Sequence, residues 1–255
     1  MKKDPIAAIA GKIAEGGRNL FFTGAGISTE SGIPDYRSQG GIWDQFRPVY
    51  FDDFMSSRDA RIEYWRQKTE LYPDLTRARP NAGHLAIATL FGMGLVEAVI
   101  TQNIDGLHQA AGIPGAKVIE LHGNTTRVRC MTCGALSDLG DAQARIKAGD
   151  PAPECFCGGY LKPDTISFGQ AMPEAEVARA VDHCRNCDFF CVVGSTLLVQ
   201  PAAQMPLYAR HSGAFLAIVN LSETPCDGIC HARVCENAGP VLAEIADRVT
   251  ALTEA

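Results

Sequence analysis

Apolar residues gather in five short runs along the chain, and each run ends in polar or glycine residues. The runs cover residues 20–22, 96–100, 118–121, 189–193 and 215–219. Apolar runs of this length are typical of strands that are buried on both faces of a parallel sheet. The residues that follow them include Gly24, Asn103, His122, Ser195 and Asn220. Because the carboxyl ends of parallel strands share one edge of a sheet, the pattern predicts a ligand site along that edge.

Segments with helical periodicity lie between several of these runs, and the fold class follows from that alternation. The first helix is expected to begin after Asp4, which can cap it, and to end at Gly16. Its expected apolar face is Ile6, Ile9 and Ile13, with Pro5 in the first turn. Strands that alternate with helices predict an α/β fold with a doubly wound, mostly parallel sheet.

Residues 38–78 hold eight of the 19 aromatic residues of the chain, and a helical segment is expected there. The candidate caps are Asp52, Asp53 and Ser57. About half of the aromatic residues are expected in a core and the others in the wall of a pocket. A second helix is expected over residues 84–92, after a break at Pro80-Asn81.

The first apolar run leads directly into a glycine-rich turn, Thr-Gly-Ala-Gly-Ile-Ser. Gly24 and Gly26 predict that a phosphate approaches bare backbone N–H groups, and a helix opening near Ser28 would point its positive end at the anion. The spacing departs from G-x-G-x-x-G because Thr29 stands where the third glycine is expected. A plain tight turn is therefore the alternative for this segment taken alone. Residues 32–37, Gly-Ile-Pro-Asp-Tyr-Arg, add a stiff turn and an Asp/Arg pair within reach of the same ligand.

Composition narrows the class of protein. The chain of 255 residues carries a net charge of −6, which argues against direct nucleic-acid binding as its main function. Hydrophobic residues make up 46% and charged residues 20%, which suits one large globular domain with a smaller inserted module. No apolar run approaches the roughly 18 residues of a membrane helix, so no membrane partner is expected. Lys12 and Glu15 interrupt the first apolar stretch, which argues against an export signal and for a cytoplasmic protein.

The ten cysteines are expected to be thiols in the cytoplasm, so their spacing is interpreted first as metal chemistry. Cys130-x-x-Cys133 and a second pair, Cys155-x-Cys157, have the arrangement of a closed zinc site. Four thiolates leave zinc no open position, so the ion would hold a module together. The second pair departs from the usual spacing by one missing residue. A later Cys-x-x-Cys pair at positions 184 and 187 is the alternative, and the other cysteines are expected to pack as ordinary thiols.

Together these motifs resemble the sirtuin family, the NAD-dependent protein-lysine deacylases. The matching segments are residues 24–28 and 32–37, 101–108 (Thr-Gln-Asn-Ile-Asp-Gly-Leu-His), 122–123 (His-Gly), the four cysteines, 162–164 (Lys-Pro-Asp), 168–169 (Phe-Gly) and 194–196 (Gly-Ser-Thr). They follow the family's order and span nearly the whole chain. The departures are Tyr36 where phenylalanine is usual, the short Cys155-x-Cys157 spacing, and Thr-Ile-Ser at 165–167 in place of a more aliphatic run.

The resemblance implies a Rossmann-like dinucleotide-binding domain and a smaller zinc-binding and helical domain formed by two insertions. The large domain would take residues 1–37, 79–125 and 160–255, the helical insertion 38–78 and the zinc insertion 126–159. NAD and an acyl-lysine protein or peptide would enter the cleft between the domains from opposite sides. The implied reaction removes the acyl group from lysine and releases nicotinamide and O-acyl-ADP-ribose. An NAD glycohydrolase or ADP-ribosyltransferase and a non-catalytic NAD-sensing module are the alternatives on this scaffold.

The resemblance also implies roles for residues. His122 would be the base for a ribose hydroxyl, because the unperturbed pKa of histidine lies near the working pH. Asn103 and Asp105 are the other candidate catalytic residues, at the nicotinamide ribose and carboxamide. His84 and His108 are expected in helix caps or packing. The residues expected at NAD are Gly24, Ala25, Gly26, Ser28, Pro34, Asp35, Tyr36, Arg37, Gln102, Asn103, Ile104, Asp105, Gly194, Ser195, Thr196, Asn220, Leu221 and Ala238; those expected at the peptide are Phe168, Gly169 and Val199; those expected at structural zinc are Cys130, Cys133, Cys155 and Cys157.

The acyl preference is a further hypothesis from the resemblance. Sirtuins that prefer acidic acyl groups carry a tyrosine followed three positions later by an arginine, whereas here Gln67 follows Tyr64 and Lys68 follows Trp65. A planar guanidinium can bind a carboxylate through two hydrogen bonds, which an amide cannot do. We therefore expect neutral acyl groups, acetyl first. Lys68 and Arg61 leave a weaker preference for acidic acyl groups as the alternative.

Overall fold

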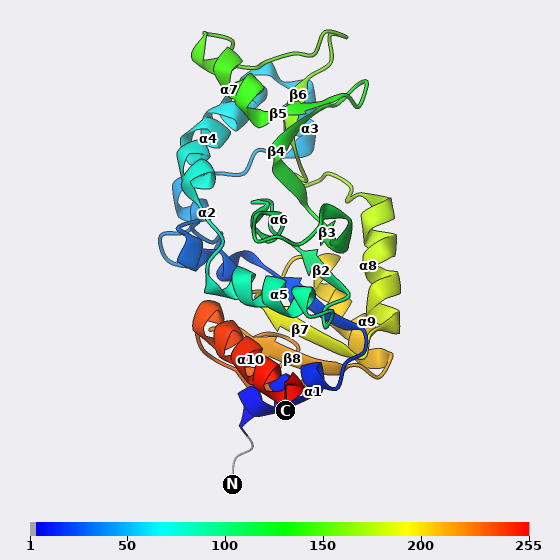
Figure 1. Ribbon diagram of the computed structural model, residues 1–255. Helices are drawn as coiled ribbons and strands as arrows, with labels where there is room; N and C mark the ends of the chain where they lie inside the picture. Colours follow the sequence, from blue (N-terminus) through cyan, green and yellow to red (C-terminus); the bar gives the residue numbers. More distant parts are fainter. Residues whose placement is uncertain (1–3, 255) are drawn as a thin grey trace.

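A computed structural model describes residues 4–254 and places six parallel strands in one sheet (Figure 1). The strands are β1 Asn19–Thr23, β2 Ala98–Thr101, β3 Val118–Glu120, β7 Phe189–Val193, β8 Phe215–Val219 and β9 Ala232–Val234. Their order is β3-β2-β1-β7-β8-β9, so the chain builds outward from β1 in one direction and from β7 in the other. All five predicted strands and the doubly wound sheet are confirmed. The prediction missed β9, a three-residue edge strand whose middle residue is Arg233.

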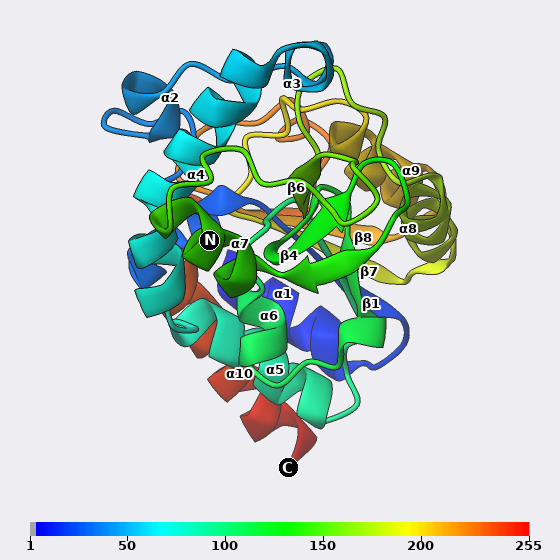
Figure 2. The ribbon, with the colours of Figure 1, turned by 90° about the horizontal axis from the view of Figure 1, so that it is seen from above.

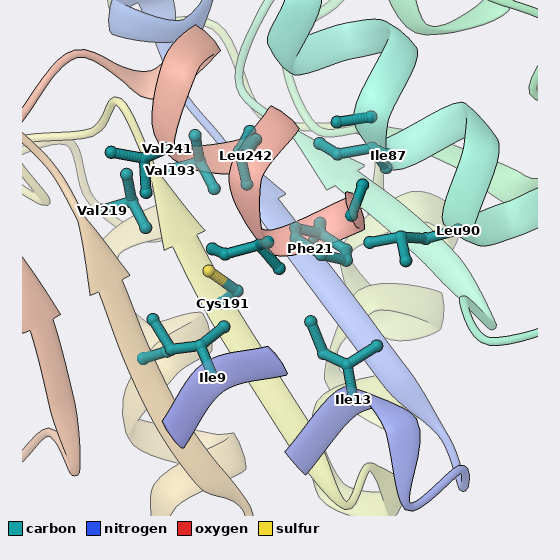
Figure 3. Packing of buried hydrophobic residues seen from close by; sticks show 14 of the residues in the cluster. Ile9, Ile13, Phe21, Ile87, Leu90, Cys191, Val193, Val219, Val241 and Leu242 are labelled. Carbon is teal, nitrogen blue, oxygen red and sulfur yellow. The ribbon is translucent and has the colours of Figure 1, made fainter. Parts of the chain in front are cut away.

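Helices cover both faces of this sheet (Figure 1). One face carries α1 Pro5–Ala14, α5 Ala82–Gly92 and α10 Ala238–Thr253, and the other carries α8 Glu174–Asn186 and α9 Met205–His211. Successive side chains of a strand point to opposite faces. Phe21 accordingly packs with Ile9 and Leu242 on the first face (Figure 3), while Leu20 and Phe22 join the core on the second.

The first helix begins at its predicted cap, whereas the second begins at a cap that the prediction missed. Asp4 Oδ1 accepts hydrogen bonds from the N–H groups of Ile6 at 3.0 Å and Ala7 at 3.2 Å. The second helix begins two residues earlier than predicted, at Ala82, because Asn81 caps it. Asn81 Oδ1 accepts the N–H of Gly83 at 2.9 Å, so the helix starts where its first donors find a partner.

The predicted helical segment at 38–78 is three helices. They are α2 Ile42–Gln45, α3 Phe51–Ser56 and α4 Arg58–Arg77. Ser57 caps α4 as predicted, since its Oγ accepts the N–H of Ala60 at 3.3 Å. Asp52 and Asp53 were wrong as caps, because they lie inside the first turn of α3, where acidic side chains favour the positive end of the helix.

A second, antiparallel sheet stands apart from the parallel one (Figure 1). Its strands are β4 Gly123–Cys130, β5 Leu136–Asp138 and β6 Leu161–Thr165, in the order β5-β4-β6. Helix α7 Leu139–Lys147 follows β5 along the chain. Both views place α7 beside α4, with α8 on the opposite side of the molecule (Figure 2). Trp65 of α4 packs against Val128 and Leu139 and donates from Nε1 to the Leu161 carbonyl at 3.1 Å. The helical and zinc segments therefore share one core.

Short elements complete the chain. They are α6 Leu107–Ala110 and the 3₁₀ turns η1 Ala25–Ile27, η2 Thr29–Ser31, η3 Gly115–Lys117 and η4 Ala202–Gln204. Within residues 4–254, no helix combines the length and the apolar character needed to cross a membrane.

Candidate active site

The predicted ligand edge centres on the point where the strand order reverses, between β1 and β7. Thr23 and Val193 are partners at the ends of these two strands. A Cβ atom on Gly24 would lie 2.7 Å from the Gly194 oxygen, and one on Gly26 would lie 2.8 Å from Gly194 Cα. These contacts are shorter than side chains tolerate, so the glycines allow the turns after β1 and β7 to touch. A crevice at such a reversal is where open α/β sheets bind their ligands.

Two expectations about the glycine turn are wrong. The N–H groups of Gly24 and Gly26 are not free for a phosphate, because they donate to the carbonyls of Val193 and Gly194, each at 2.9 Å. No α-helix opens near Ser28 either; two short 3₁₀ turns stand there instead. The N–H of Ala25, between the two glycines, has no hydrogen-bond acceptor in the part of the chain that the structure describes.

Ser28 brings three of the predicted site residues together. Its hydroxyl donates to Asp105 Oδ2 at 2.7 Å and accepts from Asn103 Nδ2 at 3.0 Å. The other oxygen of Asp105 accepts the N–H of Leu107 at 2.9 Å, at the start of α6. The side chains of Ser28, Asn103 and Asp105 therefore form one connected group, drawn from the turn after β1 and the loop after β2.

His84 is a fourth member of this group that the sequence analysis placed only in a helix cap. It does complete the cap of α5, with Nδ1 at 3.1 Å from Asn81 Oδ1. Its Nε2 also lies 3.5 Å from Ser28 Oγ, and burial lowers the pKa of the imidazole. The available signal was Asn81, whose Nδ2 donates to the Ile27 carbonyl at 2.7 Å and ties this helix start to the glycine turn.

His108 is a packing histidine, as predicted. Its ring is buried and lies 5.1 Å from the ring of His84. Nε2 lies 2.8 Å from Thr23 Oγ1, which in turn contacts Thr101 Oγ1 at 2.8 Å. Nδ1 has no partner within residues 4–254. Burial, and then the charge of His84, lower the pKa of His108 to about 3, so this imidazole is neutral.

His122 lies two residues after the end of β3 and is held at one ring nitrogen. Its Nδ1 lies 3.0 Å from the backbone carbonyl oxygen of Gln102, which can only accept, so Nδ1 carries the proton. The Nε2 atom is then the basic nitrogen. Burial lowers the pKa of His122, and the hydrogen bond to Gln102 opposes that shift. The imidazole is therefore neutral near pH 7 and able to accept a proton.

Gln102, one of the residues expected at NAD, meets His122 through its backbone carbonyl. The side-chain amide of Gln102 instead donates to Ser195 Oγ at 2.7 Å. Ser195 Oγ also accepts the N–H of Leu197 at 3.3 Å. The end of β2 is thus tied to the turn after β7, where the predicted phosphate-binding residues Ser195 and Thr196 lie.

The segment after the glycine turn folds on itself. Asp35 Oδ1 accepts the N–H groups of Arg37 at 3.0 Å and Ser38 at 2.8 Å, so the turn uses this carboxylate. The Tyr36 ring packs at a tilt against Trp43 with ring centroids 5.1 Å apart, and the Trp43 ring lies 5.6 Å from that of Phe168. This aromatic row joins the segment predicted at NAD to a residue predicted at the peptide. Pro34 stands at the start of the same turn.

Three of the residues predicted at NAD, Asn220, Leu221 and Ala238, lie farther along the ligand edge of the parallel sheet. A fourth, Ile104, lies beside β4. Asn220 follows β8 and donates from Nδ2 to the Ser222 carbonyl at 2.9 Å. The next residue, Leu221, is 67% exposed, and Ala238 is buried at the first position of α10. The carbonyl of Ile104 accepts the N–H of Thr125 at 2.8 Å, which joins the loop after β2 to β4.

The predicted peptide edge has its carbonyl groups already engaged. The Phe168 carbonyl accepts the N–H of Phe51 at 2.9 Å, and the Val199 carbonyl accepts the N–H of Ala203 at 2.8 Å. Gly169 adopts a left-handed conformation with φ of +81°, which turns the chain next to the exposed Phe168 ring. Each of these two carbonyls therefore already has one hydrogen-bond donor from within the chain.

The four predicted zinc ligands form a single cluster. Their sulfur atoms all lie within 4.8 Å of one another, with Cys130 and Cys157 at 3.5 Å and Cys133 and Cys155 at 3.8 Å. A tetrahedral zinc ion with Zn–S bonds of about 2.3 Å separates its sulfur ligands by about 3.8 Å. The donor set fits zinc despite the short spacing, because Phe156 points outward, fully exposed, and lets its two neighbours turn inward.

The alternative metal pair is excluded by its surroundings. Cys184 and Cys187 are buried in the apolar core under α8, and the Cys187 thiol contacts the Cys184 carbonyl at 3.3 Å. Within residues 4–254 the only group of three or more potential ligands is the four-cysteine cluster. Cys191 and Cys226 are buried thiols, and Cys235 is an exposed one, as predicted.

Comparison with known proteins agrees with this geometry. The pattern of the Sir2 family matches residues 24–201. A relative from Bradyrhizobium diazoefficiens, "NAD-dependent protein deacetylase 1", is 47% identical over 238 residues, which is 93% of this chain and 93% of the relative. A solved Sir2 enzyme superposes with a TM-score of 0.87 at 38% identity and covers 98% of this chain and 99% of its own. A Sir2 complex with a p53 peptide and NAD+ superposes with a TM-score of 0.81 at 37% identity, covering 94% and 95%.

Proposed function

This chain belongs to the Sir2 family and is an NAD-dependent protein deacylase with a structural zinc site, and we propose how its residues share the reaction. Acyl-lysine proteins or peptides are its substrates, in line with the p53 peptide in a similar structure. NAD, when bound, supplies the ribose carbon that receives the acyl oxygen. The observation that carries the proposal is that the basic nitrogen of His122 and the Ser28–Asn103–Asp105 group stand on one sheet edge.

His122 acts as the general base. Its Nδ1 proton is fixed by the Gln102 carbonyl, and its unprotonated Nε2 takes the proton of a ribose hydroxyl. Because Gln102 N–H donates to the Thr23 carbonyl at 2.9 Å, the carbonyl that orients the imidazole is itself part of the sheet edge. The ring is oriented before substrate arrives, as efficient proton transfer requires.

Asn103 and Asp105 hold the nicotinamide side, and Ser28 fixes both. One oxygen of the Asp105 carboxylate accepts a hydrogen bond from Ser28, and the other accepts one from the start of α6. The position of the carboxylate therefore does not depend on a ligand. The phosphates bind at the N–H of Ala25 together with Ser195 and Thr196. The remaining residues assigned to NAD are Gly24, Gly26, Pro34, Asp35, Tyr36, Arg37, Gln102, Ile104, Gly194, Asn220, Leu221 and Ala238; those assigned to the peptide are Phe168, Gly169 and Val199.

The small domain consists of the segments 38–78 and 126–159, and the large domain of 1–37, 79–125 and 160–255, of which residues 1–3 and 255 lie outside the described part. The core shared by Trp65 and Val128 supports grouping the segments 38–78 and 126–159. The antiparallel sheet draws its third strand, β6, from the range 160–255, so the two domains meet at this strand. Zinc supplies a cross-link between Cys130, Cys133, Cys155 and Cys157. We place the protein in the cytoplasm, where such thiols stay reduced.

Acetyl and other neutral acyl groups are preferred. Gln67, which stands where an arginine would favour acidic acyl groups, donates to the Arg47 carbonyl at 2.9 Å. The other candidate arginine, Arg61, donates to the Phe54 carbonyl at 3.0 Å and lies 3.6 Å from the centre of the Tyr160 ring. Gln67 carries an amide, which cannot bind a carboxylate as a guanidinium does, and the Arg61 guanidinium is already engaged by the Phe54 carbonyl and the Tyr160 ring.

Lys68 is a further cation of this region, and it faces a tyrosine. Its Nζ lies 5.3 Å from the centre of the buried Tyr64 ring, at the same distance as Nζ of buried Lys162. Burial raises the pKa of Tyr64, but the charges of Lys162 and Lys68 lower it to about 7. The tyrosine thereby offsets part of the positive charge, which weakens its attraction for an acidic acyl chain.

Incubation with NAD and an acetyl-lysine peptide tests the function. A deacylase releases nicotinamide only when the acetylated peptide is present, and the peptide loses its acetyl group. Release without peptide would identify an NAD glycohydrolase, and NAD binding with no release would identify a sensing module. The same peptide with unmodified lysine is the control.

A further inference from the structure

A chain of charged groups crosses from the large sheet to the small one beside His122. Glu120 is the last residue of β3, in the parallel sheet, and Asp164 lies in β6, in the antiparallel sheet. Arg127 of β4 bonds to both: its Nη2 lies 2.8 Å from Glu120 Oε2 and its Nε lies 3.2 Å from Asp164 Oδ2. One guanidinium therefore connects the two sheets.

Glu120 is itself fixed to the large domain. Its Oε1 accepts Gln109 Nε2 and Asn124 Nδ2, each at 2.6 Å, which leaves Oε2 for Arg127. Gln109 belongs to α6, which begins with the loop that carries Asp105. The carboxylate is mostly buried, with a side-chain exposure of 13%. Arg127 thus binds a carboxylate whose position is fixed by Gln109 and Asn124, and not a mobile surface group.

The backbone around His122 leaves a gap that Arg127 fills. Gly123 pairs with Thr165, and the next pair of the β4–β6 ladder is Val128 with Pro163, so the ladder is interrupted between Gly123 and Val128. Gly123 turns the chain with φ of +75°, and a Cβ atom there would lie 2.0 Å from the Asp164 oxygen. Through this interrupted stretch, the side chain of Arg127 supplies the link to β6 that the backbone does not.

We propose that Arg127 is a positioning residue of the deacylation reaction, which holds the antiparallel sheet at a fixed angle to the parallel sheet and so holds His122 at its working position. The inference rests on the proposed role of His122 as the base. The ring of His122 stands at the corner between the sheets, and its own carbonyl accepts the N–H of Ile166 at 3.0 Å, just after β6. A shift of β6 relative to β3 therefore moves the backbone of His122.

Arg129 offers a matched control within the same strand. It donates to Asp164 through Nε at 2.7 Å and Nη2 at 3.2 Å. The side chains of Arg129 and Arg127 are almost equally exposed, at 42% and 41%. Its bonds stay within the antiparallel sheet, since Asp164 lies in β6 and Arg129 in β4. Removing either arginine takes one positive charge and one partner from Asp164, but only Arg127 reaches Glu120.

The test compares Arg127→Gln with Arg129→Gln in the full-length protein. We expect Arg127→Gln to lower kcat at saturating NAD and acetyl peptide by about tenfold or more, a rate effect of at least about 1.4 kcal/mol. Its Kd for ADP-ribose stays within about twofold of wild type, because the large domain binds the phosphates. Arg129→Gln keeps kcat within about twofold. Equal losses of kcat in the two variants, or wild-type kcat in Arg127→Gln, overturn the inference.

Salt dependence supplies a readout that a stability effect alone does not move. Arg127 is partly exposed, so added salt screens its bonds, and wild-type kcat should fall toward the level of Arg127→Gln between 50 mM and 1 M NaCl. Arg127→Gln should respond less to salt. Parallel salt responses in the two proteins contradict the proposal. If Arg127→Gln does not fold, Glu120→Gln replaces it, since this change removes the charge that Arg127 binds while keeping an oxygen for Gln109 and Asn124. Wild-type kcat in Glu120→Gln then contradicts the proposal.

The inference and the function fail differently. An inactive wild-type protein would overturn the proposed function and leave Arg127 without a reaction to position. An active wild-type protein whose two arginine variants behave alike would overturn only the role of Arg127.

Discussion

The Nδ1 atom of His122 lies 3.0 Å from the backbone carbonyl oxygen of Gln102, although the two residues are separated by the whole of α6 and β3. Parallel pairing of β2 with β3 brings them together, because both residues follow the ends of these neighbouring strands. A backbone carbonyl has no proton to give, so the contact assigns the tautomer of the imidazole.

The acid limb of the pH–rate profile should report this imidazole. Burial lowers the pKa of His122 from its ordinary value of 6.5, so the midpoint of the acid limb of kcat/KM for the acetyl peptide should lie below pH 6.5. The direction of this pH effect follows from the role of His122 as a base. The imidazole must be unprotonated to act, and a lowered pKa keeps it unprotonated to lower pH. Profiles measured from pH 5 to 9 check this, and an acid limb above pH 6.5 would contradict it.

Replacing His122 by alanine should abolish turnover without abolishing NAD binding. Loss of a positioned base costs about two to four powers of ten in rate. The measurements are kcat with the acetyl peptide and Kd for NAD by calorimetry. His211→Ala, on the exposed end of α9, is the control and should keep wild-type kcat. Near-normal deacylation by the His122 variant would place the base elsewhere.

Purified protein should contain about one zinc ion per chain, because a four-thiolate site is closed and structural. Cys130→Ala should lose the metal and unfold the small domain, since the binding energy of a structural ion is part of the folding energy. Cys235→Ala removes an exposed thiol outside the cluster and should keep the zinc. Metal analysis and circular dichroism distinguish the variants, and an intact fold without zinc would refute the module as described.

Acetyl-lysine should be a better substrate than succinyl-lysine on the same peptide sequence. The reason is that Gln67 carries an amide where a guanidinium would favour acidic acyl groups, and that Arg61 already donates to the Phe54 carbonyl. The comparison is kcat/KM for the two acyl groups. A ratio that favours succinyl by tenfold or more, about 1.4 kcal/mol, would show that Lys68 or another group binds the carboxylate.

The buried His108 should make the fold less stable in mild acid. Its pKa is lowered from 6.5 to about 3, so the unfolded chain binds a proton there that the folded protein does not. Above pH 6.5 the imidazole is neutral in both the folded and the unfolded chain, and the free energy of unfolding is not reduced. As the pH falls from 6.5 toward about 3, the free energy of unfolding decreases progressively. Urea unfolding at pH 7.5 and 5.0 measures it. His108→Gln, which can still donate to Thr23, should lose less stability than wild type over this interval; an equal loss would contradict the assignment.

Much of the large domain could be predicted from local patterns. The buried runs around Phe21 and Val192 read as strands because they are apolar throughout, and Asp4 and Ser57 marked helix starts through their capping chemistry. The strand β9 was not predicted, because it has only three residues and Arg233 in the middle interrupts their apolar pattern. Edge strands need less apolar surface than central ones, so their pattern is weak.

The sequence by itself determined the chemical groups: the glycine turn, the histidine after β3, the amide and carboxylate after β2, and four cysteines with ligand spacing. These are set by residue type and by spacing along a few turns of chain. Only the tertiary structure decided their partners. It paired the N–H groups of Gly24 and Gly26 with carbonyls at the end of β7 and in the turn after it, brought His84 to Ser28 and placed Arg127 between two sheets. Such contacts join residues far apart in the sequence, and strand order and packing, rather than local propensity, bring them within hydrogen-bonding distance.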